Sequence, residues 1–172
     1  APQGNMCWAG RPNAMPKPVR ACLAITPCNW AARPCPPWLP AALPSAGWHA
    51  LAARITCLGN DPAVRVIVLR AEGRGFCAGV DIKELTAHPE RIISVNAGNY
   101  ATFEAIHRCQ VPVIVAVHGF VLGGGIGISG AADIVVASDC ATFGVPEVDR
   151  GAMGGGAHLQ RLFPVQKVRH MY

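Results

Sequence analysis

The run Val111–Val117 (VPVIVAV) is apolar at every position, and it constrains the fold more than any other feature of this 172-residue chain. A strand without a polar face belongs in a sheet that is covered on both sides, which is typical of parallel sheets with helices packed against them. Two further runs of strand length and β-branched composition lie before and after it, Val64–Arg70 (VRVIVLR) and Asp133–Ala137 (DIVVA). We therefore predict an α/β fold in which the strands of a largely parallel sheet alternate with helices.

Apolar residues at helical spacing occupy the segments around these strands. They predict helices over residues 45–59, 91–107, 125–132 and 157–163, with Pro164 at the start of one more. Ser45 is of the residue type that caps a helix N-terminus, and Gly59 can end the same helix. The expected apolar face of the second helix comprises Ile92, Val95, Tyr100, Phe103 and Ile106.

The composition of the chain changes at about residue 45. Residues 1–44 contain ten prolines, four cysteines and three tryptophans, without a helical or strand period. Proline at this density removes backbone donors and breaks helices and inner strands. We predict that this atypical segment is not part of the fold and that residues 45–172 form one domain. At the other end, Val165, Val168 and Met171 would form an apolar stripe with little to pack against, so we interpret the C-terminus as truncated.

Charge and composition argue against several classes of protein. The net charge of +5 comes from residues 1–60, which hold five basic residues and no acidic one, so it does not indicate a basic face for nucleic acid. No run of about 18 apolar residues offers a membrane span, and the start of the chain lacks the regions of a signal peptide. The eight cysteines include no Cys-x-x-Cys pair, which argues against a metal site and favours reduced thiols in the cytoplasm.

Two glycine-rich segments follow the first two predicted strands, Gly75–Leu85 (GFCAGVDIKEL) and His118–Gly127 (HGFVLGGGIG). Small residues at a strand-to-helix turn leave backbone N–H groups uncovered. Two such turns on neighbouring strands can aim two N–H groups at one point, and such a pair stabilises a developing oxyanion. We therefore predict an oxyanion hole where the two segments meet.

The second segment runs into a match to a dinucleotide-binding motif. Gly125–Gly130 (GIGISG) has the spacing G-x-G-x-x-G, and Asp149 lies 19 residues beyond it. A dinucleotide site needs this run directly after a strand, whereas the preceding predicted strand ends at Val117. An NAD-dependent oxidoreductase is therefore kept only as an alternative.

Three separated motifs resemble the crotonase superfamily, also called the enoyl-CoA hydratase/isomerase family. They are VRVIVLRAEGRGFCAGVDIKEL, VPVIVAVHGFVLGGGIGISGAADIVVAS and ATFGVPEVDRG, and the resemblance spans residues 48–172. It implies a partial ββα spiral, so that residues 45–172 form an incomplete crotonase-like acyl-CoA-binding domain. It also implies an acyl-CoA thioester as substrate, no separate cofactor, and assembly of a complete protein into homotrimers or hexamers.

The resemblance assigns roles by motif position. It implies that the thioester oxygen binds the backbone N–H groups of Val80 and Gly124, which polarises the thioester and acidifies the carbon beside it. Both roles use only the main chain. The Ala78 carbonyl falls where the family holds the adenine ring, and Arg74 and Lys83 fall where it often places bases near the CoA phosphates.

The acidic residues depart from the family's pattern. A hydratase of this family uses two glutamates, and Glu147 in the Pro-Glu motif occupies the second position, so we predict that it is the catalytic acid or base. The first position holds Gly127, which cannot transfer a proton. Asp149 is a candidate second acid, although a surface acid paired with Arg150 is the favoured interpretation, and His158 is a weaker candidate. We interpret Cys77, inside the first glycine segment, as a small apolar residue.

The sequence therefore predicts an enzyme that stabilises the enolate of an acyl-CoA, named by its family an enoyl-CoA hydratase/isomerase, in fatty-acid or related acyl-CoA catabolism. The glycine at the first glutamate position leaves isomerisation and hydrolysis open beside hydration. An acyl-CoA hydrolase or a homologue that cleaves C–C bonds is one alternative, and an inactive truncated homologue is another.

Overall fold

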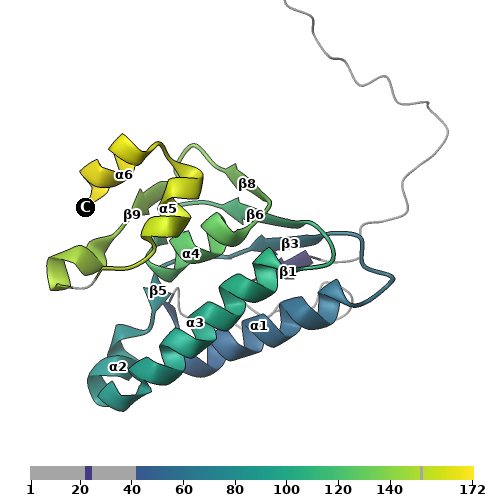
Figure 1. The fold of residues 1–172 in the computed structure, drawn as a ribbon, viewed down its shortest axis with the longest axis horizontal. Helices are drawn as coiled ribbons and strands as arrows, with labels where there is room; N and C mark the ends of the chain where they lie inside the picture. Colours follow the sequence, from purple (N-terminus) through teal and green to yellow (C-terminus); the bar gives the residue numbers. More distant parts are fainter. Residues whose placement is uncertain (1–21, 25–41, 152) are drawn as a thin grey trace, which may run out of the picture.

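The computed structural model describes residues 22–24, 42–151 and 153–172 (Figure 1). The strands of this part are β1 (Cys22–Ala24), β2 (Ala42–Leu43), β3 (Ile67–Arg70), β4 (Gly75–Cys77), β5 (Gly79–Val80), β6 (Val113–Val117), β7 (Phe120–Leu122), β8 (Ile134–Ala137) and β9 (Thr142–Gly144). The helices are α1 (Ser45–Gly59), α2 (Ile82–Ala87), α3 (Ile92–His107), α4 (Gly124–Ala131), α5 (Gly156–Leu162) and α6 (Val165–Met171). Two 3-10 helices complete the elements, η1 (Pro89–Arg91) and η2 (Pro146–Arg150).

Most of the strands form two parallel sheets, and successive turns of the chain add strands to both sheets in the same order. One sheet has the order β1-β3-β6-β8 and the other the order β4-β7-β9, while β2 and β5 form a separate parallel pair. The strands β3, β6 and β8 of the first sheet are followed along the chain by β4, β7 and β9 of the second. This repeat of two strands and a helix, in two layers, is a ββα spiral, so the predicted α/β fold is confirmed.

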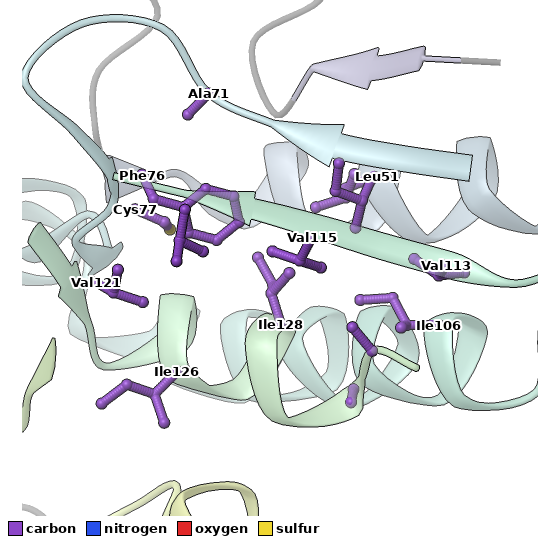
Figure 2. Close-up of a cluster of buried hydrophobic side chains, with 14 of the residues drawn as sticks. Leu51, Ala71, Phe76, Cys77, Ile106, Val113, Val115, Val121, Ile126 and Ile128 are labelled. Carbon is purple, nitrogen blue, oxygen red and sulfur yellow. The ribbon is translucent and has the colours of Figure 1, made fainter. Parts of the chain in front are cut away.

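The core lies against the two inner strands of the first sheet. Ile67 and Leu69 of β3 face Val113 and Val115 of β6 in register, and none of the four side chains is accessible to solvent. Figure 2 shows Val113 and Val115 close to Ile106 and Ile128 of the covering helices. Each fully buried side chain of this size contributes roughly 1.5–3 kcal/mol relative to an exposed one.

The segments predicted as glycine loops contain strands that the sequence did not reveal. β4 and β5 lie within residues 71–80, and β7 lies within the second glycine segment. These strands have only two or three residues each, and β4 and β5 include glycine, so the local pattern is too short to reveal them. They exist because each pairs with a strand from another turn of the spiral, as β7 does with β4 and β9.

The predicted helices are confirmed, but the buried face of α3 was misjudged. Val95 and Ile106 of α3 are buried, but Ile92 and Tyr100 are 43% and 67% exposed, so including them in an inward face was wrong. The α3 surface that packs on α1 is instead opened by Gly98, where an added side-chain carbon would lie 2.8 Å from Trp48 Cβ. A glycine at a helix contact lets two helices approach closely, and hydrophobic spacing alone does not show this.

Among the described residues of the segment 1–44, five take part in strand pairs. β1 pairs with β3 through Cys22 and Val68, and β2 pairs with β5 through Ala42 and Gly79. Leu43 is buried in the core. The rest of that segment, apart from Pro44, lies outside the described residues, so the boundary at residue 45 stays a prediction.

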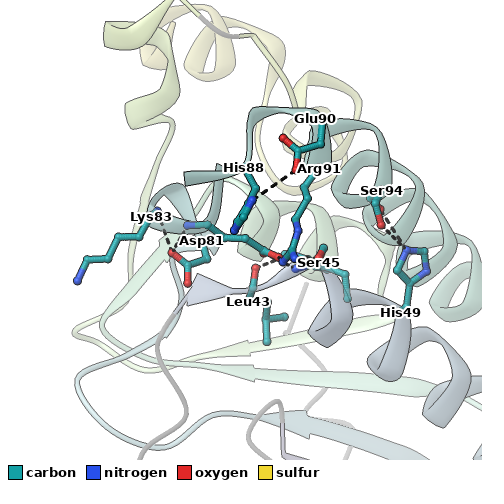
Figure 3. A network of polar contacts seen from close by, with 11 residues as sticks. Leu43, Ser45, His49, Asp81, Lys83, His88, Glu90, Arg91 and Ser94 are labelled. Carbon is teal, nitrogen blue, oxygen red and sulfur yellow. Dashed lines mark hydrogen bonds and ion pairs between the residues drawn. The ribbon is translucent and has the colours of Figure 1, made fainter. Parts of the chain in front are cut away.

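A carboxylate from another helix caps the N-terminus of α1. The expected cap residue, Ser45, is instead the first residue of the helix, with Pro44 at the cap position. Glu84 of α2 accepts hydrogen bonds from the Ser45 backbone N–H at 2.7 Å, from the Ser45 hydroxyl at 2.7 Å and from Arg91 at 2.6 Å. Figure 3 shows Ser45 and Arg91 in this network. The bonds from Ser45, and then the one from Arg91, lower the pKa of Glu84 from 4.5 to about 2.

We expect Glu84→Gln to lower the melting temperature at neutral pH and to weaken its pH dependence. Because the pKa of Glu84 is depressed in the folded state, the carboxylate stabilises the fold above its unfolded value of 4.5, and this stabilisation is lost as the pH falls toward 2. Melting temperatures at pH 7, 4 and 2.5 measure the effect. The gap between the two proteins should be largest at pH 7, and a gap that stays constant would contradict the assignment. Glu90→Gln, at an exposed ion pair with His88, is the matched control.

Candidate active site

The two glycine segments meet where β5 approaches the start of α4. A side-chain carbon built on Gly79 would lie 2.8 Å from the Gly124 backbone nitrogen, which is closer than any side chain tolerates. Gly79 also has a φ of +91°, in the region that favours glycine. The predicted meeting of the two turns is therefore observed, and it requires the absence of a side chain at residue 79.

The backbone N–H groups of Val80 and Gly124 are both left available by the local hydrogen bonding. The Asp81 N–H donates to the Leu43 carbonyl across to β2, at 3.0 Å. Neighbouring N–H groups of a strand point to opposite sides, so the Val80 N–H points away from β2. Gly124 is the first residue of α4, where backbone N–H groups have no acceptor within the helix and the helix dipole favours negative charge.

Glu147 lies beside this junction. It belongs to η2, whose first residue is Pro146, and its side chain is partly buried. A side-chain carbon built on Gly123 would lie 3.7 Å from both Glu147 carboxylate oxygens and from the Ala78 carbonyl oxygen. The carboxylate and that carbonyl therefore flank the residue that precedes Gly124.

One pocket joins these groups. It has a volume of about 620 Å³ and lies among β5, α2, α3, α4, η2 and α5. Six residues considered from the sequence for a role in the site line it: Ala78, Val80, Gly124, Gly127, Glu147 and His158. These candidate residues lie far apart in the sequence but line the same cavity.

Three predicted site residues are not among those that line this pocket. Asp149 lies in η2 with Glu147, but its side chain is exposed. Arg74 and Lys83 are exposed as well, on either side of the first glycine turn. Their assigned roles stay predictions.

The position of the first family glutamate is filled by an aromatic ring. Gly127 lies one turn into α4, and a side-chain carbon built there would collide with the Phe103 ring. That ring makes edge contacts with Trp48 at 6.0 Å and with His158 at 4.8 Å between centroids. Since the ring is held on both sides, it has little freedom to yield to a side chain at residue 127. The aromatic row of Trp48, Phe103 and His158 therefore replaces a carboxylate in this pocket.

The pocket also contains residues that sequence analysis missed. Asn96 and Asn99 line it from α3, at spacings of three and four that place them on one helix face with Phe103. Ile82 and Met153 line it as well and are 68% and 80% exposed. Nothing in the local pattern distinguished the two asparagines from an ordinary solvated helix face.

Cys77 supports the first glycine turn. Its side chain is fully buried, as expected of a small apolar residue, and its sulfur accepts a hydrogen bond from the Gly79 N–H at 3.3 Å. Burial raises the pKa of the thiol to about 11. The thiol is therefore un-ionised at neutral pH and is not a nucleophile here.

Residues Gly125–Gly130 do not form the phosphate-binding turn that a dinucleotide site requires. Gly125–Gly130 lie inside α4, and all six residues are buried. A dinucleotide fingerprint needs its glycines in an open turn between strand and helix. The glycine at residue 125 instead lets α4 pack closely against β4. A side-chain carbon built on Gly125 would lie 2.6 Å from the Cys77 carbonyl oxygen.

The described residues contain neither a metal cluster nor a membrane-spanning helix. No group of three or more His, Cys, Asp or Glu side chains is placed to hold a metal ion. No helix in this part of the chain is long and apolar enough to cross a bilayer. The thiols of Cys57, Cys77, Cys109 and Cys140 are free.

Comparison with known proteins shows the family. The profile of the enoyl-CoA hydratase/isomerase family matches residues 41–172, so the chain belongs to that family. Over 133 residues it is 53% identical to the (7aS)-7a-methyl-1,5-dioxo-2,3,5,6,7,7a-hexahydro-1H-indene-carboxyl-CoA hydrolase of Rhodococcus jostii. It is 50% identical, also over 133 residues, to the protein of the same name from Mycobacterium tuberculosis.

The matches cover part of each relative. The alignment takes in 76% of this chain but 52% and 54% of the two hydrolases, so the chain spans about half their length. Among solved structures, the enoyl-CoA hydratase of Mycobacterium smegmatis superposes with a TM-score of 0.71 at 34% identity, over 76% of this chain and 52% of that one.

We expect that restoring the family glutamate by Gly127→Glu lowers stability and creates no hydratase. Overpacking of a filled site costs about 1–3 kcal/mol, or a fall of several degrees in melting temperature. Circular dichroism melting and a crotonyl-CoA hydration assay measure the two effects.

The double variant Gly127→Glu/Phe103→Ala is the control for the collision. Because it removes the ring that the new side chain strikes, its stability loss should be smaller than the sum of the two single losses. Additive losses would show that Phe103 does not fill the space beside residue 127.

Proposed function

We propose that the protein containing this chain is an acyl-CoA enzyme that stabilises a thioester enolate. The observation that supports this proposal is that the two glycine turns meet beside Glu147 in one pocket. The thioester oxygen binds the N–H groups of Val80 and Gly124, and the charge that develops on it is stabilised by both donors. Removing one donor of such a pair costs about 3–4 kcal/mol of transition-state stabilisation.

Glu147 transfers the proton. Its carboxylate lies against Gly123, and therefore close to the α-carbon of an acyl group whose thioester oxygen is bound at Gly124. A positioned carboxylate contributes a factor of roughly 10²–10⁴ to such a proton transfer. Ala78, Arg74 and Lys83 remain proposed contacts of the CoA moiety, Asp149 a proposed second acid, and trimers or hexamers the proposed assembly.

We propose hydrolysis in preference to two-glutamate hydration. The Phe103 ring occupies the space in which a first glutamate would hold the water that adds to a double bond. The 53% identity to a protein named as the hydrolase of a bicyclic dioxo-carboxyl-CoA supports the same choice.

The site can hydrolyse a C–C bond next to the thioester without a second carboxylate. Glu147 takes a proton from water, and the water oxygen forms a bond to a ketone carbon attached to the α-carbon. The bond between these two carbons breaks, and its electron pair passes into the thioester, whose oxygen is held by the Val80 and Gly124 amides. Glu147 then returns the proton to the α-carbon, so one water is consumed and a carboxylic acid is formed.

We expect Glu147→Gln to lower turnover of a 3-oxoacyl-CoA about a hundredfold to ten-thousandfold while leaving CoA affinity unchanged, because the amide cannot accept the proton. Steady-state kinetics and calorimetric titration of CoA into the full-length protein measure the two quantities. Glu104→Gln, at an ion pair with Arg108 on α3, is the matched control. If Asp149→Asn abolishes turnover and Glu147→Gln does not, the proton transfer belongs to Asp149.

Mass spectrometry of the products tests the reaction class. Hydrolysis of the C–C bond adds one water to the 3-oxoacyl-CoA and leaves the thioester intact, so no free CoA thiol is released. Crotonyl-CoA should remain unhydrated. Hydration of crotonyl-CoA at a comparable rate would overturn the choice of hydrolysis, and release of free CoA would show that the thioester itself is cleaved.

A further inference from the structure

Two polar atoms at the pocket wall have no partner among the described residues. They are Oδ1 of Asn99 on α3 and Nδ1 of His158 on α5, and each is shielded from solvent. Leaving a shielded donor or acceptor unpaired costs free energy that a suitable ligand group can recover. Both side chains line the cavity that contains Val80, Gly124 and Glu147.

His158 is fixed in place by its surroundings. The residue packs so closely against α4 that a side-chain carbon built on Gly130 would lie 2.6 Å from its carbonyl oxygen. Its ring lies 4.8 Å from that of Phe103, centroid to centroid. Burial, followed by the charges of Arg161 and His107, lowers the pKa of His158. The imidazole is therefore neutral at neutral pH, with one nitrogen that donates and one that accepts.

Asn99 and Phe103 are one turn apart on the same face of α3. The Phe103 ring covers Gly127 and contacts the His158 ring, and Asn99 lines the same pocket. A pocket for a plain alkyl chain needs only apolar walls, so these two polar groups are unexplained by fatty acyl binding.

We infer that Asn99 and His158 select acyl groups that carry an oxygen substituent away from the thioester. The His158 N–H donates to a ketone or hydroxyl oxygen at this position, and a hydroxyl also donates to Asn99 Oδ1, while the carbon skeleton packs on Phe103. Both residues line the pocket, so an acyl group bound there lies beside the two side chains. This inference rests on the proposed acyl-CoA function and adds the chemical class of the acyl group.

Binding of non-hydrolysable CoA thioethers to the full-length protein tests the inference. Three analogues carry a cyclohexyl, a 3-hydroxycyclohexyl or a 3-oxocyclohexyl group, and calorimetry gives the affinity of each. We expect the two oxygenated analogues to bind about tenfold to a hundredfold more tightly than the cyclohexyl analogue, since the latter leaves both polar atoms unpaired.

Two variants locate the selectivity. Asn99→Leu should weaken binding of the hydroxyl analogue and leave that of the oxo analogue unchanged, whereas His158→Phe should weaken binding of both oxygenated analogues. Each should still bind the cyclohexyl analogue, which also shows that the variant is folded. His170→Phe, at an exposed position on α6, is the matched control and should keep the full preference.

The outcomes separate the inference from the function on which it rests. Equal affinity of the unmodified protein for all three analogues overturns the inference and leaves acyl-CoA binding intact. A preference that survives in both variants also overturns it, because other residues then recognise the oxygen. Failure to bind any of the analogues, or CoA itself, overturns the proposed acyl-CoA function and the inference together.

Discussion

The close contact between Gly79 and Gly124 is the constraint on which the rest of the site depends. A side-chain carbon on Gly79 would lie 2.8 Å from the Gly124 nitrogen, so the two turns reach this distance only without a side chain there. The parallel pairing of β3 with β6 places both turns at the same end of the first sheet. Glu84, which ties α2 to the start of α1, fixes the segment that follows Val80.

The aromatic row of Trp48, Phe103 and His158 determines which side chains fit beside the pocket. Trp48 is inaccessible to solvent, and its ring fills the space that a side chain at Gly124 would need, so it also supports the start of α4. Phe103 does the same at Gly127, where the family's hydratases carry a glutamate. One packing arrangement thus supports the proposed oxyanion site and leaves no room for a carboxylate at residue 127. The proposed preference for hydrolysis follows from this packing, because the remaining acid group is Glu147.

Sequence analysis predicted the long elements well and the short ones poorly. The helices α1 and α3 and the strands β3, β6 and β8 follow the predicted ranges to within about three residues, because each carries enough hydrophobic spacing to indicate its type. β4, β7 and β9 were missed, since their pairing partners are 20 or more residues away in the chain. The capping of α1 by Glu84 was missed for the same reason, as the two residues that bond are 39 positions apart.

The sequence by itself determined the fold class, the two glycine turns, Glu147 in its Pro-Glu motif and the absence of a carboxylate at residue 127. These features are local, because each is encoded in a run of neighbouring residues whose chemistry does not depend on the rest of the chain. Only the tertiary structure decided that Phe103 fills the space at Gly127 and that Asn99 and His158 line the same pocket as Glu147. Those relations join α3, α4 and α5, and side chains on separate helices meet only after the sheet has set the helices in place.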